Sequence, residues 1–204
     1  MSGARIMGAA ALALGVAAPF AGAVPERAGA SGRIDAAALA RMVAAQQDHV
    51  SALELARWLR DGRPGLRVID VRAPAAFARF SIPTAENVPI ERIPALRVRD
   101  DETVVLYSEG GAHAAQAWVF LKAAGTRNAF FIAGGLGDWF DEVVSPAIPA
   151  DPPPAEAARF AETAALSAYF GGSPRAVSGS GAASAAAGGD DREALIANAR
   201  RRGC

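Results

Sequence analysis

The feature that most constrains the fold is an apolar run that leads through two glycines into alanine-rich sequence. The run Val104–Tyr107 is rich in β-branched and aromatic residues, which is typical of a buried strand in a parallel sheet. Gly110 and Gly111 follow it. Beyond the glycines, apolar residues recur at helical spacing: Ala114, Ala117, Trp118 and Leu121. The sequence therefore predicts a strand, a short loop and a helix in direct succession.

Such a junction collects backbone N–H groups at the positive end of a helix dipole. Several donors then point into one small concavity, which favours a negatively charged ligand. We therefore predict an anion-binding loop of six consecutive residues: Ser108, Glu109, Gly110, Gly111, Ala112 and His113. A loop of this kind usually presents a nucleophile at its first position, which here is Ser108.

Further strands alternate with helical segments along the middle of the chain. Leu66–Val71 and Asn128–Ile132 read as buried strands, and Gly134–Gly135 allows a sharp turn beside the predicted loop. The alternation predicts the α/β class, with a parallel sheet covered by helices on both faces and right-handed crossovers.

Several short motifs, in this order and spacing, resemble a rhodanese domain. The motifs are Asp70-Val71-Arg72, Phe77, Ile82-Pro83-Thr84-Ala85, Asn87-Val88-Pro89, the loop from Ser108 to His113, and Gly134-Gly135-Leu136-Gly137-Asp138-Trp139. The resemblance extends from about Val50 to Pro149. It implies a rhodanese-like parallel sheet flanked by helices.

The resemblance also implies roles for individual positions. In that family the first loop position is a cysteine that carries a persulfide sulfur, and the sixth is commonly arginine; here they are Ser108 and His113. Phe80-Ser81 stands where the family usually has Gly-His. Asp70 and Arg72 are implied to be largely structural, tying the strand end to neighbouring backbone, with a direct role at the site as the alternative.

Sulfur transfer requires a nucleophile that is partly ionised near neutral pH and can hold a second sulfur atom. A cysteine thiol, with a free pKa of about 8.5 that a helix N-terminus lowers further, meets both needs. The hydroxyl of Ser108 meets neither, because a helix dipole moves a pKa by less than about one unit. We therefore assign no confident catalytic residue and expect no persulfide cycle at Ser108.

Other readings of the loop remain open. Ser108 and His113 could form a serine-hydrolase pair, although no acidic residue except Glu109 lies nearby in sequence to orient the imidazole. We expect instead that His113 caps the loop by hydrogen bonding to the backbone, with anion binding or a pH switch as alternatives. Glu109 is either a solvated side chain or a charge that disfavours thiosulfate-like ligands.

The chain divides by composition into four parts. Residues 1–23 carry Arg5, an uncharged run and a small-x-small ending at Ala21-Gly22-Ala23, which predicts a signal peptide or, if uncleaved, an N-terminal membrane anchor. A buried helix is the third reading. Residues 24–48 form a linker and an accessory helix, 49–149 the rhodanese-like domain, and 150–204 a helical extension and flexible tail. We expect an exported protein, periplasmic or extracytoplasmic.

Local signals define several helices. Asp35 is a plausible N-cap for a helix through Gln47, and Ser51 with Glu54 forms a capping box for the next. Residues 154–170 read as a helix, residues 171–190 as a flexible stretch, and the last residues as a short basic helix.

Composition excludes some functions. The formal net charge is +0, with 21 basic and 21 acidic residues, which argues against nucleic-acid binding. Because Cys204 is the single cysteine, an intramolecular disulfide is impossible. His49 and His113 lie too far apart in sequence to suggest a metal site, so we expect no bound metal. We also expect no cofactor.

Two functions remain. The first is an exported module without sulfurtransferase activity that binds a small anion, a sulfur compound or a protein partner. The second is an active sulfur-handling enzyme that uses Cys204, whose three neighbouring arginines would make the thiol more reactive. Cys204 could also be an inert terminus or pair with another chain.

Overall fold

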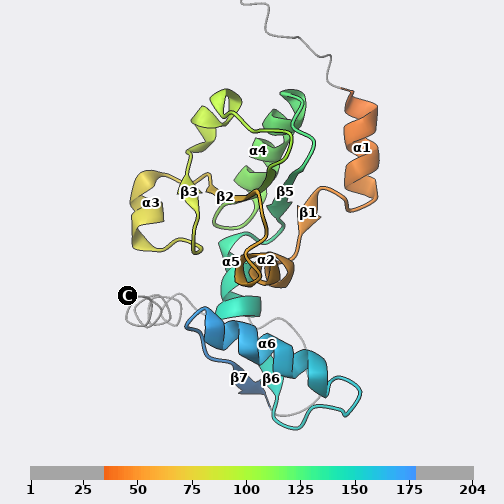
Figure 1. Cartoon of the computed structure of the whole chain (residues 1–204), viewed down its shortest axis with the longest axis vertical. Helices are drawn as coiled ribbons and strands as arrows, with labels where there is room; N and C mark the ends of the chain where they lie inside the picture. Colours follow the sequence, from red (N-terminus) through yellow and green to blue (C-terminus); the bar gives the residue numbers. More distant parts are fainter. Residues whose placement is uncertain (1–34, 178–204) are drawn as a thin grey trace, which may run out of the picture. The chain divides into compact units, whose positions relative to one another are not determined.

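The computed structural model describes residues 35–177 (Figure 1). Its strands are β1 (His49–Val50), β2 (Leu66–Asp70), β3 (Glu86–Asn87), β4 (Thr103–Tyr107), β5 (Ala129–Ile132), β6 (Ala147–Pro149) and β7 (Arg175–Val177). Its helices are α1 (Ala36–Ala44), α2 (Ala52–Arg60), α3 (Pro74–Arg79), α4 (Ala112–Ala123), α5 (Leu136–Asp138) and α6 (Ala157–Tyr169), with a 3₁₀ segment η1 (Ile90–Ala95) and a π-helical segment η2 (Trp139–Val144).

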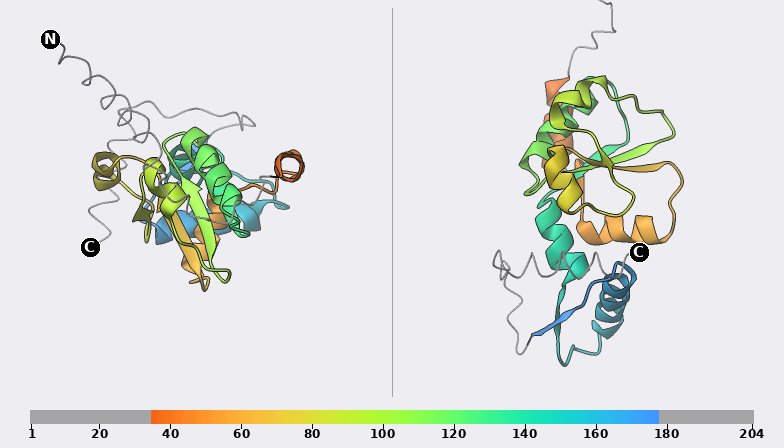
Figure 2. Two further views of the ribbon diagram at one scale, coloured as in Figure 1. Left: turned by 90° about the horizontal axis from the view of Figure 1, so that it is seen from above. Right: turned by 90° about the vertical axis from the view of Figure 1, so that its left-hand side faces the viewer.

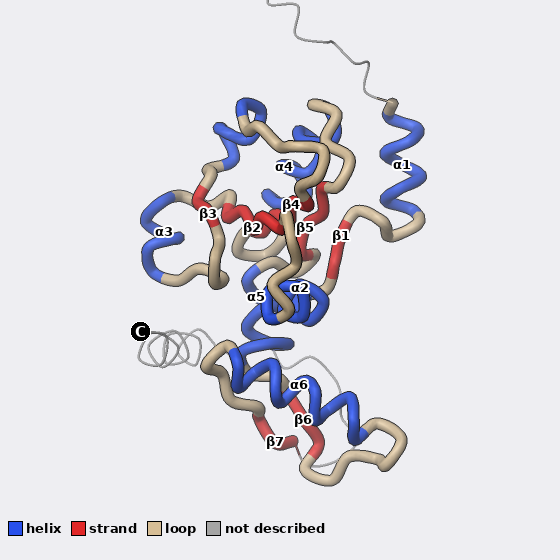
Figure 3. The backbone as a smooth tube through the Cα atoms, viewed as in Figure 1, coloured by secondary structure: helices blue, strands red, loops and turns tan. Residues whose placement is uncertain are grey.

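The main sheet has five strands in the order β1-β5-β4-β2-β3, and every neighbouring pair is parallel. Strand β4 lies at the centre, where Val105 is in register with Val68 of β2 and Phe130 of β5. All five residues of β4 are buried. The sheet confirms the α/β class and the parallel arrangement that the sequence predicts, and Figure 3 shows its strands in red.

Helices cover both faces of this sheet, and two apolar clusters result (Figure 2). Because side chains alternate along a strand, Val105 and Tyr107 belong to one cluster, and Val104 and Leu106 to the other. The first cluster is completed by residues of α2, η2 and α6, and the second by residues of α4. Strand β4 is therefore buried on both faces, and its three middle residues are apolar.

Two predicted helix N-termini are confirmed. The Asp35 carboxylate accepts a hydrogen bond from the Ala38 amide, and the Ser51 hydroxyl accepts one from the Glu54 amide, so both act as N-caps. Helix α1 is shorter than predicted, since it ends at Ala44 and Gln46 adopts a φ of 53°.

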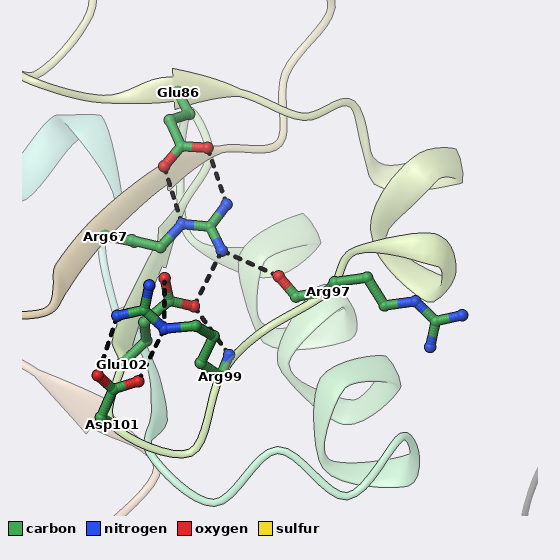
Figure 4. A network of polar contacts seen from close by, with 6 residues as sticks. All are labelled: Arg67, Glu86, Arg97, Arg99, Asp101 and Glu102. Carbon is green, nitrogen blue, oxygen red and sulfur yellow. Dashed lines mark hydrogen bonds and ion pairs between the residues drawn. The ribbon is translucent and has the colours of Figure 1, made fainter.

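An ion-pair network joins β2 and β3 to the connection that leads into β4 (Figure 4). The Arg67 guanidinium binds Glu86 through two hydrogen bonds, of 2.9 and 2.8 Å. It also donates to the Arg97 carbonyl at 3.0 Å and to the Glu102 carboxylate at 3.2 Å. The connection that leads into β4 therefore helps to hold the edge of the sheet.

The segment after the main sheet is more ordered than the sequence suggested. Helix α6 packs Leu166 into the first apolar cluster, and the Arg57 side chain of α2 forms two hydrogen bonds with Glu162 of α6. The predicted flexible stretch from Gly171 contains strand β7, which pairs in parallel with β6. The expectation of flexibility is therefore wrong for Arg175–Val177.

Candidate functional site

The candidate site is the loop that joins β4 to α4. Strand β4 ends at Tyr107 and α4 begins at Ala112, so four residues make the connection. The loop lies at the carboxyl end of the central strand, which is where open α/β sheets bind ligands. The structure thus places all six residues of the predicted loop at one strand-to-helix junction.

The turn between β5 and α5 supports this loop from one side. The Leu136 amide donates to the Ser108 carbonyl at 2.8 Å, and the Gly137 amide donates to the Glu109 carbonyl at 3.2 Å. Gly135, with φ of 61°, lies so close that a Cβ there would overlap the Ser108 carbonyl. A Cβ at Gly111, with φ of 86°, would overlap the Ala133 carbonyl. Both glycines allow the two backbones to approach each other.

The loop presents unpaired backbone donors. Within the part of the chain that the structure describes, no hydrogen-bond acceptor is assigned to five consecutive amides, those of Glu109, Gly110, Gly111, Ala112 and His113. They lie at the N-terminus of a helix of 12 residues. Unpaired amides and a helix dipole together favour an anion.

Ser108 is the first residue of the loop and is buried. It is 2% exposed, and its Oγ accepts a hydrogen bond from the Ala114 amide at 3.3 Å. That contact is the only side-chain hydrogen bond of Ser108 among residues 35–177, so the hydroxyl proton has no acceptor there. Ser108 can therefore donate one further hydrogen bond to a ligand in the loop.

The prediction that His113 caps the loop is wrong. His113 is the second residue of α4, and its side chain is exposed and forms no hydrogen bond within the described residues. The Ser108 hydroxyl accepts the hydrogen bond of the Ala114 amide instead. Since no hydrogen bond joins His113 to Ser108 in this part of the chain, the structure gives no support for a serine-hydrolase pair.

Asp70 and Arg72 tie the end of β2 to its surroundings, as the resemblance implied. The Asp70 carboxylate accepts hydrogen bonds from the Arg72 amide at 2.9 Å and from its guanidinium at 2.7 Å. The same guanidinium donates to the Phe80 carbonyl at 2.6 Å. Burial lowers the pKa of Arg72, but its hydrogen bonds to Asp70 and then to Glu109 raise it more, so the net shift is upward.

Two features near the loop were not found from the sequence. The first is a hydrogen bond of 2.9 Å from Arg72 Nη1 to the Glu109 carboxylate, which connects the end of β2 to the loop. The second is the buried phenol of Tyr107, whose oxygen accepts a hydrogen bond from the Ile82 amide at 3.1 Å. Burial, followed by the charge of Asp70, raises the Tyr107 pKa. A polar residue at the end of an apolar strand was the available signal for Tyr107.

Some predicted features lie outside the described residues. Cys204 and the segment 1–23 are among them. Within residues 35–177, no group of three or more histidine, cysteine, aspartate or glutamate side chains is arranged to hold a metal ion. No helix in the same range is long and apolar enough to cross a bilayer.

Known proteins are similar to part of this chain. Residues 51–142 match the description "Rhodanese-like domain". The probable adenylyltransferase/sulfurtransferase MoeZ of Mycobacterium tuberculosis (strain CDC 1551 / Oshkosh) is 33% identical over 100 residues, which are 47% of this chain and 25% of MoeZ. A protein named "Sulfurtransferase" from Allochromatium vinosum is 33% identical over 75 residues, which are 35% of this chain and 69% of that protein. The chain thus spans about a quarter of the length of MoeZ.

Solved structures are also similar. The crystal structure of SSP1007 from Staphylococcus saprophyticus is 29% identical, with a TM-score of 0.42, and covers 45% of this chain and 92% of its own. A rhodanese-like domain protein from Staphylococcus aureus is 28% identical, with a TM-score of 0.43, and covers 47% of this chain and 93% of its own.

Proposed function

Because the chain belongs to the rhodanese-like domain family, we propose that its loop from Ser108 to His113 binds a small anion without transferring sulfur. Relatives at 33% identity carry the name sulfurtransferase. In this chain an alcohol stands at the loop position where the family resemblance implies a thiol. In this proposal the loop still binds an anion, but it forms no covalent bond to sulfur.

The observation that carries the proposal is the environment of the Ser108 oxygen. It is buried and already accepts a hydrogen bond from the Ala114 amide. The amides of five further loop residues have no acceptor within residues 35–177. The site therefore offers donors to a ligand, while its one hydroxyl lacks a base that could activate it.

A persulfide cycle cannot run on this hydroxyl. The attacking group in sulfur transfer is a thiolate, and serine activation needs a neighbouring general base. In the described part of the chain, no histidine or carboxylate is hydrogen-bonded to Ser108. Binding without transfer is the chemistry that remains.

We further propose that the protein acts outside the cytoplasm. Arg5, the uncharged run after it and the ending Ala21-Gly22-Ala23 support an export signal. If the signal is retained, it would anchor the protein to the membrane. The loop would then present a bound anion or sulfur compound to a protein partner on that side.

A thiosulfate-to-cyanide transfer assay on the full chain tests the function. We expect no transfer above the rate without protein for the wild type or for Cys204→Ala. We expect Ser108→Cys to gain measurable transfer, because a thiol at this position would lie at the N-terminus of α4, where its pKa falls and thiolate forms.

Each other outcome has a defined meaning. Wild-type transfer that disappears in Cys204→Ala would contradict the proposal and support the enzyme that uses Cys204. Wild-type transfer that persists in Cys204→Ala would contradict both hypotheses. A folded Ser108→Cys protein that gains no transfer would show that the loop is no longer shaped for a sulfur anion.

A further inference from the structure

The Arg72 side chain distributes its donors between two acidic residues. Its Nε and Nη2 bind the Asp70 carboxylate, and Nη2 also donates to the Phe80 carbonyl. Nη1 remains, and it donates to the Glu109 carboxylate at 2.9 Å. Glu109, the second residue of the loop, is therefore held by an arginine that is also hydrogen-bonded to Asp70.

The charges of Asp70, Arg72 and Glu109 do not cancel. Asp70 is fully buried and Arg72 is 9% exposed, so these two groups neutralise each other away from solvent. Glu109 adds a second negative charge, and its side chain is 69% exposed. The three groups together carry one net negative charge beside a loop whose amides favour anions.

The ion pair determines where the Glu109 charge lies. An exposed glutamate without a partner would sample many rotamers and spend most of its time in solvent. The contact with Arg72, a side chain that is itself held by Asp70 and Phe80, keeps the carboxylate beside the end of β2, the strand that pairs with β4. Glu109 also contributes one of the unpaired amides, so one residue supplies both a donor and a negative charge to the site.

Ser108 provides a second and independent sign of a ligand. Its hydroxyl is 2% exposed and has no acceptor for its proton among residues 35–177. Buried donors without an acceptor are uncommon, because each one costs desolvation energy. A ligand oxygen in the loop would satisfy this donor together with the amides.

We propose that Glu109, held in place by Arg72, makes the loop select singly charged oxyanions over doubly charged ones. This inference rests on the proposed function, because it concerns the ligand of the same loop. Coulomb repulsion is proportional to the charge of the ligand, so Glu109 disfavours a dianion twice as much, in free energy, as a monoanion. Sulfate and thiosulfate would bind more weakly than a monovalent oxyanion of similar size.

Calorimetric titration of the full chain with sulfate and with perchlorate tests this selection. The two ions are tetrahedral oxyanions of different charge. The variant is Glu109→Gln, whose amide oxygen can still accept the bond from Arg72. The control is Glu156→Gln on α6, which makes the same change in net charge and removes a comparable ion pair, that with Arg159.

At low ionic strength we expect Glu109→Gln to bind sulfate about ten-fold more tightly than the wild type, and perchlorate about three-fold more tightly. Added salt should reduce both ratios, since the Glu109 side chain is exposed. Glu156→Gln should bind both ions as the wild type does.

If Glu109→Gln strengthens the binding of both ions by the same factor, or changes neither affinity, Glu109 does not select by ligand charge. Either result would overturn this inference and leave anion binding by the loop intact. Equal gains in Glu109→Gln and Glu156→Gln would also overturn it, because net charge alone would then explain them. If neither ion binds to any of the three proteins, the selection and the proposed function both fail.

Discussion

At the scale of single residues, the site depends on what Ser108 and its neighbours do with their hydrogen bonds. The Ser108 oxygen accepts the Ala114 amide and thereby takes the capping role predicted for His113. Its carbonyl accepts the Leu136 amide, so both ends of this residue are fixed by other segments. The loop is held in shape before any ligand arrives, which lowers the entropic cost of binding.

Gly135 is the residue that we expect to tolerate change least. Its φ of 61° and ψ of −136° suit glycine, and a Cβ would overlap the Ser108 carbonyl. We predict that Gly135→Ala lowers the free energy of unfolding by about 3 kcal/mol, as strain and overpacking add together. Urea denaturation of the full chain measures the loss.

Gly125→Ala is the matched control for this substitution. Gly125 also has a positive φ, of 89°, but no atom lies within 4 Å of the point that a Cβ would occupy there. Gly125→Ala should lower the free energy of unfolding by about 1 kcal/mol, because only the backbone conformation disfavours alanine there. Equal losses for the two variants would contradict the close packing of Gly135 against the loop.

The sequence predicted this site unevenly, for physical reasons. The loop followed from a local pattern of strand, glycines and helix, and the structural role of Asp70 and Arg72 was implied by the family resemblance. The bond between Arg72 and Glu109 joins residues that are 37 positions apart, and no local pattern encodes it. The cap predicted for His113 was wrong because the Ser108 hydroxyl accepts the Ala114 amide, and the exposed His113 side chain forms no hydrogen bond within residues 35–177.

At the scale of elements, side-chain hydrogen bonds stabilise the edge strand β3 of the main sheet. Strand β3 has two residues and lies at one edge, where it pairs only with β2 in that sheet. The Arg67 network adds side-chain bonds between these two strands. Long apolar strands such as β4 were predictable by pattern, whereas the two- and three-residue strands were not, because so few residues show no periodicity.

The Arg67–Glu86 pair predicts a pH dependence. The hydrogen bond from Arg67 lowers the pKa of Glu86 from its ordinary 4.5. The stabilisation is therefore present above pH 4.5 and is lost as pH falls through the lower folded value. We expect Glu86→Gln to lose about 0.5 kcal/mol of stability at neutral pH, a small figure because the Glu86 side chain is 46% exposed.

Urea denaturation at several pH values checks this. The difference between wild type and Glu86→Gln should shrink below pH 4.5 and then vanish. Asp101→Asn removes a more exposed pair, that of Asp101 with Arg99, and should leave stability unchanged. A difference for Glu86→Gln that stays constant across the range would contradict a contribution from the ion pair.

At the scale of the whole molecule, the helical extension belongs to the same folded unit as the sheet. Leu166 of α6 is fully buried in the first apolar cluster, and Phe170 packs edge-on against Trp139 at 5.1 Å between ring centres. The sequence predicted the helix from composition and periodicity. It could not predict the partner of that helix, because the contacts join α6 to residues far earlier in the chain.

We therefore predict that Leu166→Ala destabilises the sheet domain as well as the helix. Loss of a fully buried leucine should cost about 3 kcal/mol. A single cooperative unfolding transition, followed by both tryptophan fluorescence and circular dichroism, should move to lower urea. Tyr169→Ala, on the same helix but 61% exposed, should move it far less. Separate transitions for the two probes would contradict a shared core.

The central claim is that the loop binds without forming a bond to sulfur. Peptide mass mapping of wild type and Ser108→Cys, after incubation with thiosulfate, tests this claim most directly. We predict one added sulfur atom on the peptide containing position 108 of Ser108→Cys, and none on the same peptide of the wild type. Sulfur covalently attached to the wild-type loop peptide would contradict the account.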